Sequence, residues 1–465
     1  MQNLSRPLIL VGGSVRAAAA DARRAGYQVI AVDRFGDRDL RTSCKHWVQY
    51  DAGHQWIARL ADLHSVPLVP VGGFSWPTAQ ELTPEIDDFL GSRLIAYPDQ
   101  AEMDRLNSPH LLGKIAEGSG AIFPETRQFV EGKFETVFQP KEPQSSESSQ
   151  WLVKPKNHAG GVGIHLASQE TRLCLKRGLT LSGRGKNTAE TTRPPKGQTP
   201  FQTAPRVESW QFLQRKINGR SLGANYLAMP SPNGPVVSFL GAYGGLTYRR
   251  NPEHRFLYGG SFGPLTLSNQ VVETLKILGV RCAQSLTLVG LFNLDLICKP
   301  DQTLALLEVN PRFSGSMELI GQEHSDGKTS LSLIDWHLIA YKLRNREDEA
   351  NHLAFPVHEQ ASTSEIYCKR IVYAQAETPH ASLVDWEKLA NSLATGTNGN
   401  VKFCDIPDGN AAIATGAPIC TAVVSGAVNF RQAIQMSAQA ARRVRRSAGQ
   451  RLSHTLENVS TPKPN

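Results

Sequence analysis

The sequence predicts an α/β protein with more than one domain, and three observations support this prediction. Near the N-terminus, short apolar runs alternate with an Ala-rich segment, which is the pattern of a β-α-β unit. Between residues 291 and 310, two longer apolar runs flank a turn-like segment, as the strands of a hairpin do. The 465 residues exceed what one ordinary hydrophobic core holds, so we expect two or three domains.

Residues 1–98 are predicted to form a Rossmann-like domain. Its expected elements are a strand over 8–11, a helix over 15–25, a strand over 28–32 that ends at Asp33, and a strand over 66–71. The turn after the first strand, Gly12-Gly13-Ser14-Val15-Arg16-Ala17, lacks the G-x-G-x-x-G spacing that lets a backbone approach a pyrophosphate. A purely structural role is therefore favoured over a dinucleotide site.

A larger domain is predicted over 99–345, followed by a small β-rich C-terminal domain over 346–450 and a frayed tail over 451–465. Two stretches of the larger domain, 139–150 and 177–205, contain few residues able to build a core, and we expect surface insertions there. The C-terminal region is expected to contain strands over 365–374, 401–406 and 416–424 and a helix over 429–446.

The chain has a formal net charge of +8 and seven cysteines. Much of the positive charge lies in 176–206 and 442–446, without the interleaved aromatic residues of a nucleic-acid surface, so nucleic acid is not an expected partner. The cysteines lack metal-binding spacing, and reduced thiols are expected. No run approaches about 18 apolar residues, so no membrane span is predicted. The start of the chain does not resemble a signal peptide, and we expect a cytoplasmic protein.

Three polar side chains interrupt the apolar strands of the predicted hairpin. If its turn centres on Asp301 and Gln302, Asp295 lies directly opposite Glu308, and Asn310 projects from the same face as Glu308. Oxygen ligands at this density suit Mg²⁺ held together with nucleotide phosphates. The alternative is an edge hairpin whose acids face solvent.

A second candidate site follows the predicted strand over 151–153. The segment from Lys154 to Ile164 combines cations with the glycines Gly160, Gly161 and Gly163. Backbone amides of such a loop can fold over phosphates, and a lysine adds charge. A glycine-rich hairpin turn without a ligand is the alternative, because the P-loop pattern is absent.

The order of these segments along the chain resembles the ATP-grasp superfamily, over roughly residues 1–345. The resemblance implies an α+β ATP-grasp fold with a lid over about 115–220 that includes both insertions. It implies phosphate binding by Lys114, Lys154, Gly160, Gly161 and Gly163. The hinge residues that hold adenine would be Gln214, Arg215, Lys216 and Ile217. The metal ligands would be Asp295, Glu308 and Asn310. Catalysis would fall to Lys154 and Arg312, with Arg312 facing the transferred phosphoryl group.

The C-terminal region resembles, at Asp405-Ile406-Pro407 and over 416–421, a biotin-carboxylase-related ATP-dependent carboligase-like branch associated with tetrahydromethanopterin-linked one-carbon metabolism. Together the resemblances imply a ligase that activates a carboxylate as an acyl phosphate and joins it to an amine or other nucleophile. The implied cofactors are ATP and Mg²⁺, for which Mn²⁺ could substitute. A bicarbonate-using carboxylase and a non-catalytic ATP-binding protein stay as alternatives, and a homodimer is one option.

Two positions depart from the ATP-grasp pattern. Arg215 and Ser221 stand near the places where the family often has glutamates at the hinge and for the ribose hydroxyls. Recognition of the ribose is therefore not predicted.

Overall fold

The computed structural model describes residues 6–51, 53–130, 133–140, 150–155, 160–167, 210–248, 255–323, 332–344, 365–378, 381, 384–394, 399–409 and 412–449. The predicted insertion over 177–205, the interior of the insertion over 139–150, and the predicted tail lie outside these residues. Within the described residues, no helix is long and apolar enough to cross a membrane.

The N-terminal part is a parallel four-stranded sheet in the order β3-β2-β1-β4. Its elements are β1 (Arg6–Gly12), α1 (Arg16–Arg24), β2 (Tyr27–Asp33), α2 (Arg38–Arg41), β3 (His46–Gln49), η1 (Ala58–Leu60), β4 (Leu68–Pro70), α3 (Pro84–Gly91) and α4 (Gln100–Leu106). The strands of this sheet are apolar on both faces, as expected for a parallel sheet covered by helices. The predicted β-α-β opening is confirmed.

A five-stranded antiparallel sheet, in the order β6-β5-β9-β7-β8, follows the N-terminal part. Its elements are β5 (Thr126–Val130), β6 (Lys133–Phe138), β7 (Trp151–Pro155), β8 (His165–Leu166) and β9 (Trp210–Arg215), preceded by α5 (Pro109–Gly118). The predicted glycine loop connects β7 to β8, and the predicted hinge begins inside β9. One small sheet therefore carries both segments.

The third sheet has eight strands in the order β14-β13-β10-β11-β12-β15-β17-β16. Its strands are β10 (Arg220–Met229), β11 (Val236–Thr247), β12 (Tyr258–Gly263), β13 (Gly290–Cys298), β14 (Leu304–Asn310), β15 (Ile366–Tyr373), β16 (Asn400–Cys404) and β17 (Pro418–Ala427). The helices are α7 (Asn269–Leu286), α8 (Met317–Glu323), α9 (Leu333–Leu343), α11 (Trp386–Ala394) and α12 (Phe430–Ser447). β12 pairs with β15, so one sheet contains strands from both sides of the predicted domain boundary at residue 345.

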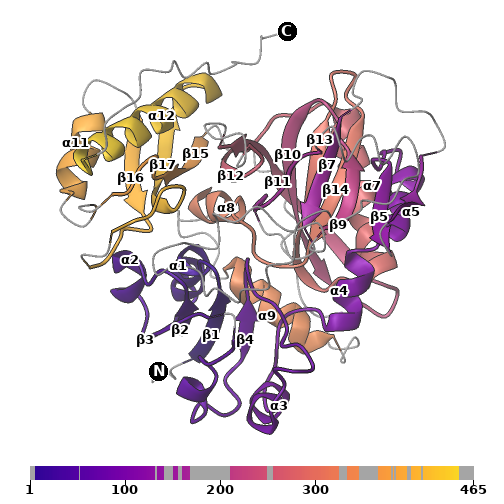
Figure 1. Cartoon of the computed structure of the whole chain (residues 1–465), viewed down its shortest axis with the longest axis horizontal. Helices are drawn as coiled ribbons and strands as arrows, with labels where there is room; N and C mark the ends of the chain where they lie inside the picture. Colours follow the sequence, from indigo (N-terminus) through magenta and orange to yellow (C-terminus); the bar gives the residue numbers. More distant parts are fainter. Residues whose placement is uncertain are drawn as a thin grey trace, which may run out of the picture.

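Alternate residues of β10 and β13 pack into two different cores. Tyr226 and Phe292 join the core that α7 covers, whereas Leu227 and Leu291 join the core shared with α9 and the N-terminal sheet. This alternation follows from strand geometry, in which successive side chains point to opposite faces. Figure 1 shows α8 at the meeting point of the N-terminal sheet, the central strands and β15. The face turned away from α7 is the face that can carry a site between these parts.

Candidate functional site

The hairpin of β13 and β14 places its two acids opposite each other. Asp295 pairs with Glu308, as the sequence predicts, and Asn293 pairs with Asn310. The predicted turn centre is wrong, however. Cys298 pairs with Leu304, which places the centre of the turn at Asp301 and not between Asp301 and Gln302. Nearer the turn, the ladder thus follows a register one residue different from the one at the acids.

A β-bulge at Leu307 reconciles the two registers. Leu296 pairs with Leu306 and Asp295 with Glu308, so Leu307 has no direct partner in the ladder. Leu306 and Val309 both pack into the core under α7, which leaves Glu308 on the opposite face with Asp295. Bulges insert one residue into a strand and re-aim the side chains beyond it. The position of Glu308 therefore depends on this irregularity.

The two carboxylates form an electrostatically strained pair. Asn310 Nδ2 donates hydrogen bonds to Asp295 Oδ2 and to Glu308 Oε1, both at 3.1 Å. Burial raises the pKa of Asp295 well above its ordinary value, and the neighbouring Glu308 raises it further, whereas Arg312 and Asn310 act in the opposite direction. Like charges held together out of water favour a shared proton or a cation.

These residues fit a divalent cation in composition. Two carboxylates and an amide are oxygen donors of the kind that Mg²⁺ takes. The amide of Asn310 turns its nitrogen to the carboxylates, however, while its Oδ1 accepts a hydrogen bond from Arg312 Nη2 at 2.9 Å. Asn310 would have to rotate its amide by half a turn to present oxygen to a metal, which exchanges two groups of nearly equal shape.

Arg312 lies where the hairpin meets the N-terminal sheet. Besides its bond to Asn310, its Nη1 donates to Phe313 O at 3.4 Å. A β-carbon at Gly72 would lie 3.6 Å from Arg312 Cζ, so the turn after β4 borders the guanidinium. The side chain thus stands at the edge of the acid pair, as the sequence predicts for a group facing a transferred phosphoryl.

Lys154 reaches the same place from the five-stranded sheet. Its side chain is buried, and desolvation lowers the pKa of its ammonium group while the Glu308 and Asp295 carboxylates oppose this effect. The ammonium is therefore close enough to both acids to interact with them electrostatically, and it comes from a different sheet. Lys154, Asp295, Glu308, Asn310 and Arg312 are therefore brought together.

The glycine loop is docked against the start of β12. Tyr258 N donates to Gly160 O at 2.8 Å, and a β-carbon at Gly161 would lie 1.9 Å from Phe256 O. Gly160, Gly161 and Gly163 all have positive φ, between 59° and 79°, which side-chain-bearing residues rarely adopt. The local conformation thus requires glycine, whatever the loop binds.

Part of the predicted hinge is already hydrogen-bonded to other segments of the protein. Arg215 N donates to Glu125 O at 2.8 Å, and Lys216 N donates to Gln150 O at 2.9 Å. Gln214 is buried, with its Nε2 3.4 Å from Thr126 Oγ1. For Ile217 N the structure records no partner among the described residues. The amides of Arg215 and Lys216 are thus already used within the protein.

Lys114 is placed on the exposed side of α5, a helix that packs against β6 and β14. No contact of its side chain with the five converging residues is recorded among the described parts of the chain. Its predicted role in phosphate binding therefore stays a prediction.

The glycines of the predicted Rossmann-like turn pack against the turn after β4. Gly13 N donates to Gly72 O at 2.8 Å, and a β-carbon at Gly12 would lie 2.7 Å from Val71 Cγ2. Asp33, at the end of β2, accepts hydrogen bonds from the backbone amides of Val15, Phe35 and Gly36 at 2.7–2.8 Å. Both its oxygens are thus used locally, which supports the structural interpretation of this turn.

A buried polar cluster behind Arg312 was not predicted. Asn225 pairs with Asn293 across β10 and β13, and its Oδ1 accepts hydrogen bonds from Ser314 Oγ at 3.0 Å and Ser316 Oγ at 3.1 Å. These bonds fix the segment that follows Arg312. An asparagine inside the apolar run of β10 was the available signal.

The sequence matches no protein-family model and no curated protein. Several solved structures nevertheless share the fold. An Aspergillus clavatus carboxyaminoimidazole ribonucleotide synthase, complexed with ATP, matches at 14% identity and a TM-score of 0.59, over 96% of this chain and 100% of that chain. The biotin carboxylase domain of Hydrogenobacter thermophilus 2-oxoglutarate carboxylase, in complex with MgADP and bicarbonate, matches at 11% identity and 0.58, over 94% and 89%.

An L-amino acid ligase from Bacillus licheniformis matches at 12% identity and a TM-score of 0.55, over 95% of this chain and 98% of that chain. These likenesses span nearly the whole chain, from the parallel N-terminal sheet through both antiparallel sheets. The chain therefore has the ATP-grasp α/β fold, as the sequence predicts.

Proposed function

We propose that this chain is a Mg-ATP-dependent ligase that activates a carboxylate as an acyl phosphate and joins it to an amine or other nucleophile. The observation that carries the proposal is the convergence of Lys154, Asp295, Glu308, Asn310 and Arg312 from two sheets. The fold supports it, because similar structures include an L-amino acid ligase, a carboxyaminoimidazole ribonucleotide synthase and a biotin carboxylase domain.

In this proposal Asp295, Glu308 and Asn310 hold Mg²⁺, which supplies charge neutralisation for the nucleotide phosphates when bound. Lys154 Nζ and the glycine loop orient the phosphates, and Arg312 donates hydrogen bonds to the transferred group. The γ-phosphoryl moves to a carboxylate oxygen as ADP leaves. The nucleophile then attacks the acyl carbon, loses its proton and expels phosphate. Positioning and charge suffice for such transfer, so no enzyme nucleophile is required.

Three finer features belong to the same proposal. The substrates are small molecules, and the C-terminal motifs at 405–407 and 416–421 favour a role in one-carbon cofactor biosynthesis. Adenine would be held beside Gln214, Arg215, Lys216 and Ile217. A homodimer is the proposed assembly, since the Hydrogenobacter domain is described as a dimer.

The test is ADP release from the full chain, screened with candidate acids in the presence and absence of amines. We expect an acid and an amine together to stimulate turnover, and Glu308→Gln to lower it by roughly 100-fold or more. Lys276→Gln, on the exposed side of α7, is the matched surface control.

Unchanged turnover of Glu308→Gln at saturating Mg²⁺ would sink the metal assignment. Stimulation by bicarbonate without any other acid would identify a carboxylase instead. Tight ATP binding without stimulated hydrolysis by any acid would identify a non-catalytic nucleotide-binding protein.

A further inference from the structure

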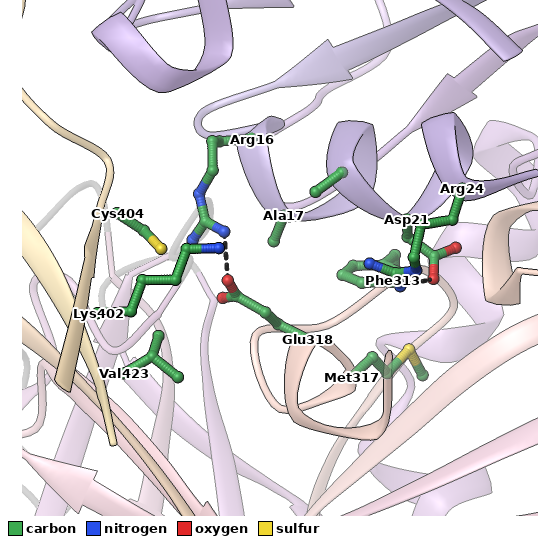
Figure 2. A pocket seen from close by; sticks show the side chains of 11 residues that line it. Arg16, Ala17, Asp21, Arg24, Phe313, Met317, Glu318, Lys402, Cys404 and Val423 are labelled. Carbon is green, nitrogen blue, oxygen red and sulfur yellow. Dashed lines mark hydrogen bonds and ion pairs between the residues drawn. The ribbon is translucent and has the colours of Figure 1, made fainter. Parts of the chain in front are cut away.

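A cavity of about 150 Å³ lies where α1, the segment after Arg312 and the C-terminal strands meet (Figure 2). Its charged lining consists of Arg16, Asp21, Arg24, Glu318 and Lys402; its other lining residues are Ala17, Ala20, Phe313, Met317, Cys404 and Val423. None of the residues assigned to nucleotide or metal lines it. Cavities of roughly this size admit a single aromatic ring.

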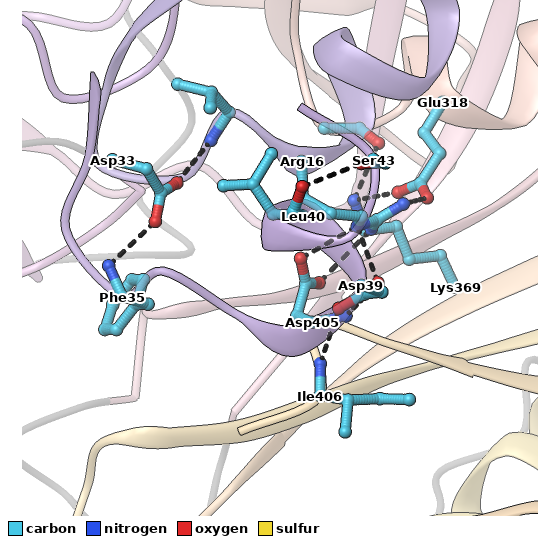
Figure 3. A network of polar contacts seen from close by, with 12 residues as sticks. Arg16, Asp33, Phe35, Asp39, Leu40, Ser43, Glu318, Lys369, Asp405 and Ile406 are labelled. Atoms are coloured by element: carbon cyan, nitrogen blue, oxygen red, sulfur yellow. Dashed lines mark hydrogen bonds and ion pairs between the residues drawn. The ribbon is translucent and has the colours of Figure 1, made fainter. Parts of the chain in front are cut away.

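The back of the cavity is held by a buried ionic network (Figure 3). Arg16 pairs with Glu318 and, through Nε, with Asp405 Oδ1 at 2.9 Å, and Lys369 Nζ lies 2.5 Å from Glu318 Oε2. The Arg16 and Lys369 cations hold the pKa of Glu318 below its ordinary value despite its burial. Arg16 Nε also lies 3.8 Å from Asp39 Oδ2, and the Asp39 carboxylate in addition accepts hydrogen bonds from the backbone amides of Asp405 and Ile406. These residues belong to three different parts of the fold, and they form a fixed wall.

The acid on the other side of the cavity is also satisfied. Asp21 Oδ2 accepts a hydrogen bond from Ile334 N at 2.8 Å, and its Oδ1 accepts one from Arg24 Nη2 at 2.7 Å. Burial raises the pKa of Asp21, and these two hydrogen bonds act in the opposite direction. A cationic ligand would therefore find no carboxylate in need of a partner.

Lys402 differs from the other charged lining residues, which all have ion partners. It is an exposed residue that extends from β16, opposite Val423 of β17, and its side chain points toward the cavity (Figure 2). For Lys402 the structure records no ion pair within the described part of the chain. The lining thus carries a lysine without an ion partner among the described residues beside an apolar wall made chiefly by Phe313, Met317 and Val423.

We propose that this cavity binds a small organic monocarboxylate, with its carboxylate at Lys402 and its apolar body against Phe313, Met317 and Val423. An inorganic anion would leave the apolar wall unused, and a cation would meet Lys402 while every acid nearby already has a partner. The site is separate from the proposed nucleotide site, although Phe313 is the residue next to Arg312. The inference does not depend on ligase activity, since binding alone tests it.

Three probes of similar size and different charge test the proposal: benzoate, benzyl alcohol and benzylamine. Their dissociation constants are measured by calorimetry with the full chain, at pH 7 and one ionic strength. We expect benzoate to bind most tightly and benzylamine least, with benzoate affinity unchanged by saturating Mg-ATP. Benzylamine binding as tightly as benzoate, or competition between benzoate and Mg-ATP, would overturn the proposal.

Two variants locate the bound probe. Lys402→Gln should weaken benzoate roughly fivefold, because the ammonium is partly exposed to solvent, and should leave benzyl alcohol unchanged. Ala20→Phe should block both probes by filling the cavity. Lys388→Gln, an exposed lysine on α11, is the matched control. Benzoate affinity that is the same in Lys402→Gln and the wild type would overturn the assigned anchor, whether or not Ala20→Phe folds.

Discussion

Asp33 in the N-terminal sheet is a buried acid, whereas Asp295 and Glu308 in the eight-stranded sheet are a half-buried pair in a different electrostatic situation. Burial raises the pKa of both Asp33 and Asp295, but three backbone amides counter the effect at Asp33, whereas a second carboxylate adds to it at Asp295. At Asp33 the backbone supplies the hydrogen bonds that the acid needs. At Asp295 the fold keeps two acids together, and the opposing effects of Arg312 and Asn310 leave the pKa raised. The hydrogen-bond donors around an acid at a strand end therefore determine its electrostatic situation more than the number of acids there does.

The largest effect should come from changing which face the metal-site residues occupy. Deleting Val309 would bring Asn310 directly after Glu308 and turn Asn310 and Arg312 toward the core under α7. We expect loss of Mg-dependent ATP turnover by at least roughly 100-fold. Deleting Leu307 would instead remove the bulge and leave Asp295 opposite Glu308.

The measurement is ADP release against Mg²⁺ concentration, with circular dichroism to establish that each variant folds. If activity depends on the face of β14 that Asn310 and Arg312 occupy, the two deletions should differ, and much of the activity should be kept when Leu307 is removed. Equal loss of activity in two folded variants would contradict it. Val309→Ala, which keeps the alternation of the strand, is the control for lost packing.

A smaller effect is expected at Asp33, whose carboxylate accepts hydrogen bonds from nearby backbone amides. Asp33→Ala leaves three backbone amides without their acceptor, two of them buried, so we expect the free energy of unfolding to fall by about 2–4 kcal/mol. Urea unfolding at pH 7 measures it, with Asp62→Ala at an exposed position as the control. A loss below about 0.5 kcal/mol would show that these bonds do not hold the β1–α1 turn in place.

The smallest effect should be a gain in the stability of the folded chain instead of a loss. The folded-state pKa of Asp295 lies above its unfolded value, so the folded chain binds the extra proton, and wild-type stability falls as pH rises from about 4 toward the folded pKa. Without Mg²⁺, Asp295→Asn should therefore raise the free energy of unfolding by about 1 kcal/mol at pH 8, which corresponds to a rise of roughly 1 °C in melting temperature for a chain of this length.

The gain should shrink at pH 5 and in the presence of Mg²⁺, where the wild-type pair is relieved. Differential scanning fluorimetry across pH 5–8, with and without chelator, provides the comparison. A variant that is less stable than the wild type at pH 8 would show that the acids are already compensated.

The sequence predicted much of the fold because local patterns determine much of it. The N-terminal β-α-β unit, the hairpin strands and α12 follow from apolar periodicity and from breaks in it. The pairing of Asp295 with Glu308 was predicted on a wrong turn centre, and the bulge at Leu307 compensated for the error. A bulge leaves no local signal in a run of four leucine and alanine residues.

Other features could not be predicted because they join distant segments. Arg16 meets Glu318 and Asp405 across roughly three hundred or more residues, and no pattern near α1 announces those partners. The same holds for Asn225, whose hydrogen bonds come from Ser314 and Ser316. Such contacts depend on how three sheets assemble, which a single sequence does not specify by periodicity.

Leu307 also matters for how related sequences are aligned. Since it is the residue that the ladder skips, a homologue that lacks it would keep both acids facing each other with one residue fewer between them. A search pattern with a fixed spacing between Asp295 and Glu308 would discard that homologue. A pattern that permits one gap at this position, and none between Glu308 and Asn310, would retain it.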